Sequence, residues 1–347
     1  MISLIKVSGS PFETGRILGE FGAGAVHEHL LQTDAWATVV RWRGSGRVAE
    51  MARLTQQMYP QIWEELQGLA EGLDVPFDDV FLWNCRGDVW AMAPEGCTTV
   101  QLPGAEAKRI AHNEDGDPGF AGRCAIAECN IDGSSQFASF VYPGSIPGHS
   151  FAVTDAGLAM TVNNLRTLHV DAGLPRMVLT RALLSAQSAD QAVALLRDSP
   201  RAGGYHLTLA DRRSNDILSI EFCSHACSVR AIETPSVHTN HMIHPEMRDF
   251  PQITTGSSGY RQRRGNQVLR EAARQDSILD PVSILRDTEN AQFPIYRNDP
   301  RDDDNENTLA TADIIVHEDR IDWQVYEYAD RPARIRMKDG HPTSGAP

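Results

Sequence analysis

A chain of 347 residues, 41% hydrophobic and 22% charged, can bury a substantial core as one large domain or two ordinary ones. Its 46 acidic and 32 basic residues give a net charge of −14, which argues against a nucleic-acid or anionic-membrane surface, because either needs a basic footprint. No run approaches the roughly 20 apolar residues that span a bilayer, and the start turns polar too early for a signal peptide. We therefore expect a cytoplasmic protein whose six cysteines, which lack Cys-x-x-Cys spacing, are thiols.

The first quarter of the chain has the pattern of helices. Apolar residues recur at three- and four-residue intervals over 53–58 and 61–73, the period of a half-buried helix. The stretch around Pro76 ends the second of these helices, and Asp78 with Asp79 is expected to cap the next one.

After Pro94 the pattern changes to short segments rich in β-branched and aromatic residues, separated by Gly, Asp and Pro, which is typical of antiparallel hairpins. Helical periodicity returns at 176–186, 188–197 and 259–275, and the tail from Lys338 is expected to fray. The absence of a regular βαβ alternation favours an α+β layered fold without a linker after the helical quarter. The expected strands are 98–102, 109–112, 124–130, 136–142, 151–154, 157–162, 205–210, 217–222, 228–232, 309–316 and 323–328.

Where the helical quarter meets the first strand, the sequence reads Glu95-Gly96-Cys97-Thr98-Thr99. A cysteine that opens a strand is usually a packed core residue, but a glycine before it leaves a carbonyl open to attack by the thiol. Such an attack gives a thioester, and its hydrolysis leaves a cysteine with its own α-amino group. That amine has a pKa of about 8 and can serve as the general base for the thiol beside it.

The stretch Gly96-Cys97-Thr98-Thr99, followed by His112-Asn113-Glu114-Asp115, resembles the penicillin acyltransferase (isopenicillin-N acyltransferase) family of Ntn-hydrolases, which includes β-alanyl-amine hydrolases. The likeness runs through almost the whole chain, and the ordered set of motifs is specific where a single one is weak. The other motifs are Pro11-Phe12-Glu13-Thr14-Gly15 with Gly19, Leu66 to Gly72, Tyr142-Pro143-Gly144 through Gly148, Gly157-Leu158, Asn163-Asn164, Ala210-Asp211, Ile220-Glu221 and His238-Thr239-Asn240-His241.

The resemblance implies an α+β fold, the four-layer αββα sandwich of Ntn-hydrolases, in which two antiparallel sheets lie between helical layers. Residues 1–96 would be a helical pro-segment, kept as a small α subunit after self-cleavage between Gly96 and Cys97. Residues 97–347 would be the catalytic β subunit, and the two pieces would together make one Ntn-hydrolase domain. The expected partners are this cleaved fragment and a small-molecule amide, an oligomer of αβ units is compatible, and no cofactor is expected.

The resemblance also assigns roles in a catalytic site. Cys97 would be the nucleophile, Asp115 would stabilise and orient the α-amino group, and Asn240 would give an oxyanion-hole N–H worth roughly 3 kcal/mol. Thr99 would assist self-cleavage through its hydroxyl or simply belong to the strand. On its own, Asp115 could equally be a turn residue of Asn-Glu-Asp-Gly-Asp.

Two further residues are assigned to the substrate-binding region. Asn113 would hold its loop there rather than perform chemistry. Arg297 ends a segment that corresponds to a Ser-Ile-Cys-Arg-like stretch of relatives, and it would bind a carboxylate or fix Asp115. Pro294 stands in the place of the serine, so the role of that serine is not transferred. The alternative for Arg297 is an arginine of a surface loop.

Rival signals are better explained without a ligand. His238, His241 and His244 recur every third residue, but Pro245 interrupts any helix here, so we expect no metal site. The acidic stretch 302–307 lacks the glycine and closing glutamate of an EF-hand and is expected to be a solvated loop. The arginines of 261–264 are expected on a solvated helix face, and the alternative is that they pair with substrate or with the acidic loop. No phosphate-binding glycine motif is present.

The sequence therefore predicts a self-processing N-terminal-cysteine amidohydrolase that cleaves a small N-acyl or N-aminoacyl amide, such as a β-alanyl amine, through a thioester. If an amine replaces water as the acceptor, the same site is an acyl-CoA-dependent N-acyltransferase, and the sequence does not choose between them. A non-catalytic or metal-binding protein on the same fold is disfavoured, because Cys97, Asp115 and Asn240 are all present.

Overall fold

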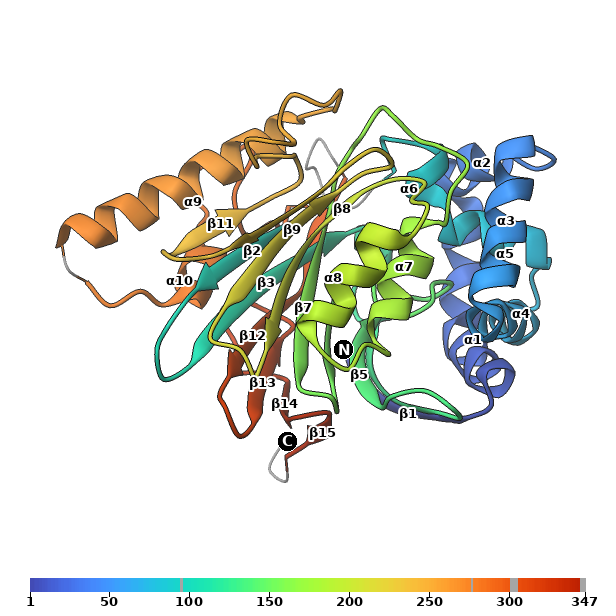
Figure 1. The fold of residues 1–347 in the computed structure, drawn as a ribbon, viewed down its shortest axis with the longest axis horizontal. Coiled ribbons are helices and arrows are strands. Elements are labelled where there is room, and N and C mark those ends of the chain that lie inside the picture. Colours follow the sequence, from blue (N-terminus) through green and yellow to red (C-terminus); the bar gives the residue numbers. More distant parts are fainter. Residues whose placement is uncertain (94–95, 276, 300–304, 344–347) are drawn as a thin grey trace.

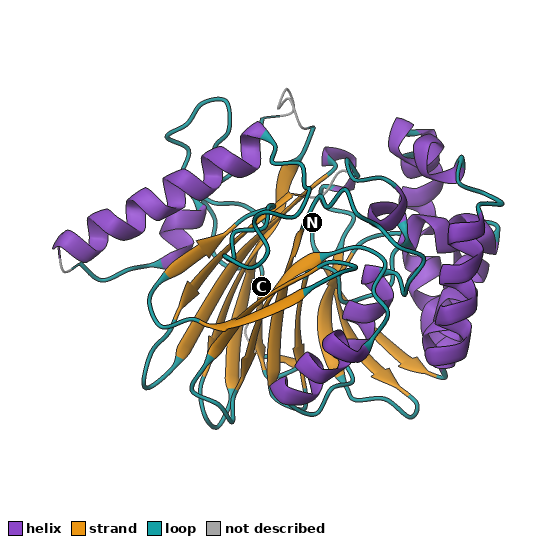
Figure 2. Ribbon diagram, turned by 45° about the horizontal axis from the view of Figure 1, so that its top comes forward, coloured by secondary structure: helices purple, strands orange, loops and turns teal. Residues whose placement is uncertain are grey.

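Two β-sheets packed face to face, with helices on their outer sides, make up the molecule (Figures 1 and 2). The computed structural model describes residues 1–93, 96–275, 277–299 and 305–343. Helices α7 (Arg176–Leu183) and α8 (Ala189–Asp198) lie on the side of one sheet, and α9 (Gly256–Gln275) and α10 (Pro281–Leu285) cover the other. This order of layers confirms the predicted αββα sandwich, in which each sheet buries one face against the other.

The first sheet contains eight strands of the described chain, in the order β1-β4-β5-β6-β7-β8-β9-β10. Its neighbours pair antiparallel except β1 and β4, which are parallel. From β1 to β10 in that order, the strands are Ser3–Gly9, Ala125–Ile131, Phe137–Val141, Phe151–Thr154, Leu158–Asn164, Tyr205–Asp211, Ile217–Phe222 and Cys227–Ala231.

The second sheet has the order β11-β2-β3-β12-β13-β14-β15 over the described residues and is antiparallel throughout them. Strand β2 packs against β7 of the first sheet, so the inner faces of β2 and β3 form one wall of the space between the sheets. In sheet order, the strands are Ser236–His238, Gly96–Leu102, Lys108–Gly116, Asn307–Val316, Ile321–Tyr326, Ile335–Lys338 and His341–Pro342.

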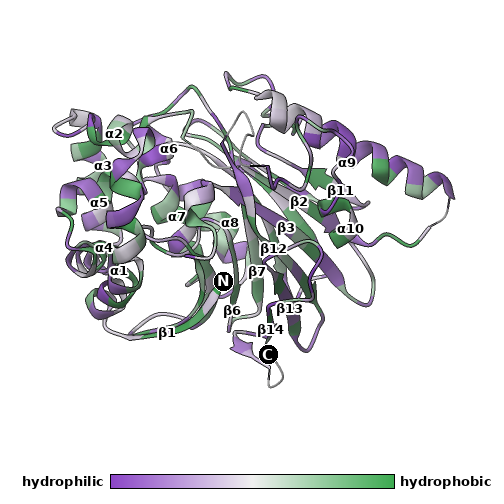
Figure 3. Ribbon diagram, turned by 180° about the vertical axis from the view of Figure 1, so that it is seen from behind, coloured by the Kyte–Doolittle hydropathy of each residue, from purple (hydrophilic) through white to green (hydrophobic). Residues whose placement is uncertain are grey.

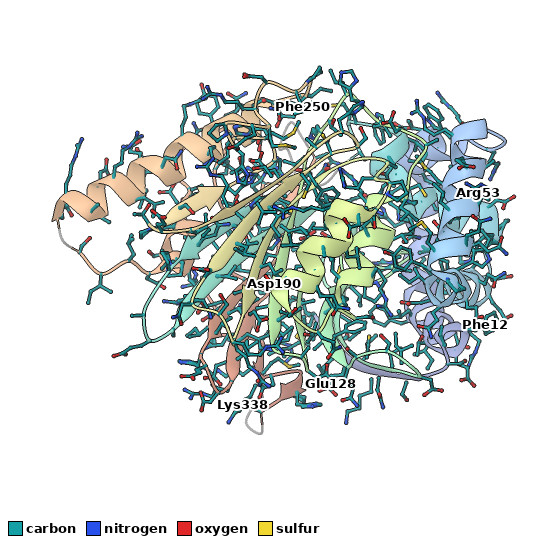
Figure 4. All side chains as sticks on the ribbon, in the orientation of Figure 1. Phe12, Arg53, Glu128, Asp190, Phe250 and Lys338 are labelled. Carbon is teal, nitrogen blue, oxygen red and sulfur yellow. The ribbon has the colours of Figure 1, made fainter. Side chains whose placement is uncertain are left out.

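The N-terminal helices form a block at one end of the sandwich, opposite α9 (blue in Figure 1). Phe12 and Arg53, labelled in Figure 4, belong to this block. Its elements are α1 (Pro11–Glu28), η1 (Leu30–Gln32), α2 (Asp34–Val40), α3 (Gly46–Met58), α4 (Pro60–Leu73), α5 (Phe77–Asn84) and α6 (Arg86–Val89). One short 3-10 turn, η2 (Pro118–Phe120), lies elsewhere, after β3.

Helices α1 and α4 cross with their backbones almost in contact. A Cβ atom on Gly15 would lie 1.9 Å from the carbonyl oxygen of Glu65, and one on Gly68 would lie 1.9 Å from that of Phe12. No side chain fits at either position, so glycine sets the distance between these helices. The two glycine-containing motifs of the resemblance in this region, residues 11–15 with Gly19 and residues 66–72, are therefore explained by the packing of these helices.

The sequence missed or misplaced several elements. Strand β1 (Ser3–Gly9) was not expected, because only Val7 of its residues is buried and the strand forms by pairing with β4. Helix α5 begins after Pro76, so Asp78 and Asp79 occupy its first turn rather than its cap. The tail does not fray at once, since His341–Pro342 pairs with β14. Residues 344–347 lie outside the described part.

Hydropathy follows the layers. Figure 3 shows mostly hydrophobic strands and a largely hydrophilic α9, and the main apolar core lies between the sheets and under the N-terminal helices. In the described residues, no helix combines the length and apolar character needed to cross a membrane. The six cysteines are thiols, as predicted.

Candidate active site

Cys97 is the second residue of β2 and is buried, with 2% of its surface exposed. Strand β2 pairs with β3 so that Cys97 lies opposite Glu114 and Gly96 lies opposite Asp115. Directly opposed residues of an antiparallel pair project to the same face. The Cys97 and Glu114 side chains therefore meet in the space between the sheets. Asp115 points to the other face, so Asn-Glu-Asp-Gly-Asp is strand at this position and not a turn.

Glu114 is the carboxylate in contact with the thiol. The Cys97 Sγ donates to its Oε2 at 3.6 Å, and Ser150 Oγ donates to the same oxygen at 2.6 Å. Tyr142 OH donates to Oε1 at 2.9 Å, and His112 Nε2 lies 3.1 Å from Oε2. Burial raises the pKa of Glu114, and the hydrogen bond with His112 is the largest of the interactions that oppose this rise.

Thr99 connects this group to the first sheet. Its Oγ1 donates to Asn163 Oδ1 at 2.8 Å and lies 2.8 Å from His112 Nδ1 and 3.3 Å from Thr161 Oγ1. Thr99 is fully buried, and its hydroxyl belongs to a hydrogen-bonded path that ends at the thiol. Its assistance to self-cleavage stays a prediction, and so does the alternative that it simply belongs to the strand.

Asn240 binds the backbone nitrogen of Cys97. The Cys97 N–H donates to Asn240 Oδ1 at 3.0 Å, and Arg261 Nη2 donates to the same oxygen at 2.7 Å. These two donors fix the amide orientation, so Asn240 Nδ2 points away and donates to the Asn164 carbonyl at 3.2 Å. In the uncleaved chain Asn240 thus presents an acceptor to Cys97, and its role as an oxyanion donor stays a prediction.

Arg261 lies at the site, although the sequence favoured a solvated helix face for it over a pairing with substrate or with the acidic loop. It is buried, not solvated, and its Nη1 donates to the Cys97 carbonyl at 2.5 Å and to Thr98 Oγ1 at 2.8 Å. A signal was present, because Arg261 falls in phase with Gly265, Leu269 and Ala272, the buried stripe of α9. The expected solvated position is found for Arg263, whose side chain is exposed.

Asp115 is fully buried and only half hydrogen-bonded. Thr308 Oγ1 donates to its Oδ1 at 2.7 Å, while Oδ2 has no hydrogen-bond partner within the described part of the chain. Burial raises the pKa of Asp115, and the nearby Arg261 and Arg297 oppose this rise. A buried carboxylate oxygen without a hydrogen-bond donor costs folding free energy. A positively charged group beside this atom would therefore be stabilised.

Gly96 lies against a buried ion pair. A Cβ on Gly96 would lie 2.3 Å from Glu306 Oε2 and 3.3 Å from Arg297 Nη1. Arg297 is fully buried and donates to Glu306 at 2.7 Å, which excludes the surface-loop alternative and corrects the expectation of a solvated Glu306. Arg166 also binds Glu306, at 3.4 Å. Glu95 and residues 302–304 of the acidic stretch lie outside the described residues.

Asn113 faces α10, away from the thiol. Its Nδ2 donates to the carbonyls of Leu285 at 2.8 Å and Ile295 at 3.3 Å, and Thr311 Oγ1 donates to its Oδ1 at 2.6 Å. The amide therefore holds the neighbouring loops, as expected, and nothing in this geometry turns it toward a substrate.

The three histidines for which no metal was expected are held by hydrogen bonds to carboxylate and hydroxyl groups. His238 Nε2 lies 2.8 Å from Glu221 Oε1, and its ring stacks on His206 at a centroid distance of 3.4 Å. His241 bonds Ser258, and His244 bonds two serines. Among the described residues, Cys97, His112 and Glu114 also bring potential ligand atoms within 4.8 Å of one another. Their mutual hydrogen bonds account for that closeness.

Two packed sheets between helical layers, with a buried cysteine opposed by a carboxylate at the start of a central strand, define the class of protein: an enzyme with the Ntn-hydrolase architecture. The particular family follows from the sequence. The chain belongs to the acyl-coenzyme A:6-aminopenicillanic acid acyl-transferase family, whose sequence model matches residues 103–330. This match begins just after Cys97 and includes Asp115, Asn240 and Arg297.

Two known proteins are similar to parts of the chain. The β-alanyl-dopamine/carcinine hydrolase of Drosophila melanogaster is 25% identical over 162 residues, which is 41% of this chain and 42% of that protein. The chain thus matches less than half the length of this relative. A variant of conjugated bile acid hydrolase from Clostridium perfringens overlaps 70% of this chain and 92% of its own, with 11% identity and a TM-score of 0.45. An overlap this loose adds nothing to the assignment.

Proposed function

We propose that the chain is a self-processing cysteine amidohydrolase that cuts its own Gly96–Cys97 bond and then cleaves a small N-acyl or N-aminoacyl amide. One observation carries the proposal: the N–H of this peptide bond is held by Asn240 in a buried polar site, and Asp115, which lies opposite Gly96 on the paired strand, has a carboxylate oxygen without a donor among the described residues. Family membership and the hydrolase activity of the Drosophila relative support the reaction class.

In the proposed first step, the Cys97 sulfur bonds to the Gly96 carbonyl carbon and the bond to the Cys97 nitrogen breaks. The nitrogen gains one proton and becomes an amine, and a thioester joins the two residues. Water then hydrolyses the thioester, which gives a Gly96 carboxylate and restores the thiol. The new ammonium can bind Asp115 and Asn240, and its neutral form is the base for turnover.

In turnover, the Cys97 thiol attacks a substrate carbonyl and the α-amine passes the proton to the leaving amine. Water resolves the acyl-enzyme in hydrolysis, whereas an amine acceptor would make the enzyme an N-acyltransferase. The family name favours this alternative, and the hydrolase relative favours water. Supplying an acyl-CoA with a free amine, or an N-acyl amine alone, and following products by mass spectrometry separates the two reactions.

The first test is the intact mass of the purified protein beside that of Cys97→Ala. We expect the wild type to appear as two fragments divided between Gly96 and Cys97, and Cys97→Ala to remain one chain of 38.2 kDa. Cys223→Ala is the matched control, since Cys223 is also buried but packs in a separate apolar cluster with Leu165, Met242 and Met247, and it should cleave like the wild type. A wild type that stays whole in every condition would contradict the proposal.

A further inference from the structure

Self-cleavage needs a general base, and the α-amine that serves as the base in the mature enzyme does not exist before cleavage. The α-amine that serves the mature enzyme is still an amide nitrogen, and its N–H is already donated to Asn240. An amide nitrogen cannot accept a proton at neutral pH, so another group must take the proton of the Cys97 thiol. This inference rests on the proposed function and concerns the first step alone.

Glu114 has the position that this step requires. Its Oε2 accepts from the Cys97 thiol at 3.6 Å, and the strand pairing places both side chains on the inner face of the sheet. The sheet is rigid here, because β2 and β3 pair over seven consecutive residue positions. The base and the nucleophile are therefore fixed relative to each other before cleavage.

His112 is held between Thr99 and Glu114. Its Nδ1 lies 2.8 Å from Thr99 Oγ1, and its Nε2 lies 3.1 Å from Glu114 Oε2. Thr99 is itself fixed, because its hydroxyl donates to Asn163 Oδ1 at 2.8 Å. The imidazole therefore holds the Glu114 carboxylate in its position beside Cys97.

We propose that Glu114, oriented by His112, is the catalytic base that removes the thiol proton of Cys97 during self-cleavage. The proton passes from Sγ to the carboxylate, the thiolate attacks the Gly96 carbonyl carbon, and the carbon–nitrogen bond breaks. Glu114 then returns the proton to the departing Cys97 nitrogen. In the mature enzyme the α-amine takes over, and Glu114 is no longer the required base.

The surroundings of Glu114 suit this task. Burial raises the pKa of Glu114, which brings the carboxyl closer to the basicity that proton transfer from a thiol needs. The other titratable groups that face it are Cys97 on β2, His112 on β3, Tyr142 after β5 and Cys124 before β4. Burial raises the pKa of Tyr142 and of Cys124, so both stay protonated around neutral pH.

The test is the rate of self-cleavage in the full-length chain, measured by intact mass during a time course of synthesis in vitro. Glu114→Gln keeps the shape of the side chain and removes the base, and we expect it to slow cleavage by at least about 100-fold. Its rate should also rise about tenfold per pH unit above neutrality, because the thiolate must then form without help. Tyr142→Phe and Ser150→Ala keep the carboxylate and should slow cleavage far less.

Several outcomes would overturn the proposal. If Glu114→Gln cleaves at the wild-type rate, or slows with an unchanged pH profile, Glu114 is not the base. Hydroxylamine, which cleaves thioesters, should not rescue Glu114→Gln, and full rescue would place the defect after thioester formation. A wild type that fails to cleave would overturn the proposed function as well, so the two failures are distinguishable. If Glu114→Gln does not fold, Tyr142→Phe becomes the deciding variant, because it keeps the carboxylate. A loss of self-cleavage as large as that in Cys97→Ala would then contradict the role of Glu114 as the base.

Discussion

At the scale of single residues, Gly96 gives a sharp prediction. Gly96→Ala would place a methyl group 2.3 Å from the buried Glu306 carboxylate, so we expect slower self-cleavage and a loss of about 1–3 kcal/mol of unfolding free energy. Urea unfolding and intact mass measure the two effects. Gly24→Ala in helix α1 is the control: its Cβ would meet no atom within 4 Å, and it should stabilise by about 0.5–1 kcal/mol. Equal effects of the two variants would contradict this account.

His244 gives a pH-dependent prediction. Burial lowers its pKa to about 4, and its ring is held by Ser219 and Ser228. The unfolded chain therefore binds the proton more readily, and the contribution of neutral His244 to stability is lost as pH falls from about 6.5 toward 4. The stability advantage of the wild type over His244→Gln should shrink over this range, by at most about 1.4 kcal/mol per pH unit.

Urea unfolding of both proteins at several pH values between those limits measures this difference. A difference that stays constant with pH would show that His244 does not change its charge on unfolding.

Residue types alone could identify only part of the site. Cys97, Gly96 and Asp115 belong to two short motifs, 96–99 and 112–115, and the pairing of β2 with β3 brings all three together. Glu114 stood in the same motif, but its contact with the thiol depends on which face each strand presents. Arg261 comes from α9, and only the packing of that helix on the second sheet brings it to Cys97.

At the scale of elements, a buried ion pair joins α4 to α7. Glu65 and Arg181 are both buried and lie 2.9 Å apart. Glu65→Ala leaves the arginine charge without its partner, so we expect a loss of about 3–5 kcal/mol. Glu50→Ala removes an exposed partner of Arg53 on α3 and should leave the melting temperature almost unchanged. Calorimetry of both variants tests the contrast, and similar melting temperatures would contradict it.

Element prediction succeeded where local patterns and packing agree. The expected strand at 151–154 matches β6, and the expected helix at 259–275 lies inside α9. It failed where pairing decides: β11 has three residues, and β1 has an exposed pattern that became a strand only beside β4. Residues 1–96, which the sequence predicts to be a helical pro-segment, therefore also supply a strand to the first sheet, which no local pattern indicates.

At the scale of the whole molecule, the two pieces on either side of the Gly96–Cys97 bond are packed together within one fold. Strand β1 is built into the first sheet, and Glu65 of the N-terminal block binds Arg181 of the larger piece. We therefore expect the fragments 1–96 and 97–347 to remain together after cleavage, and to separate only on denaturation. Native mass spectrometry beside denaturing mass spectrometry tests this. Separate fragments under native conditions would contradict it.

The same reasoning predicts how cleavage changes unfolding. Unfolding of the cleaved protein releases two chains from one body, so dilution favours the unfolded state and the melting temperature should rise with protein concentration. Cys97→Ala stays one chain, and its melting temperature should be independent of concentration over the same range. Calorimetry of both proteins across a hundredfold range, about 2–200 μM, measures the difference. A concentration-independent transition in fully cleaved protein would mean that the larger fragment alone holds the measured fold, and that the N-terminal block adds no stability to it.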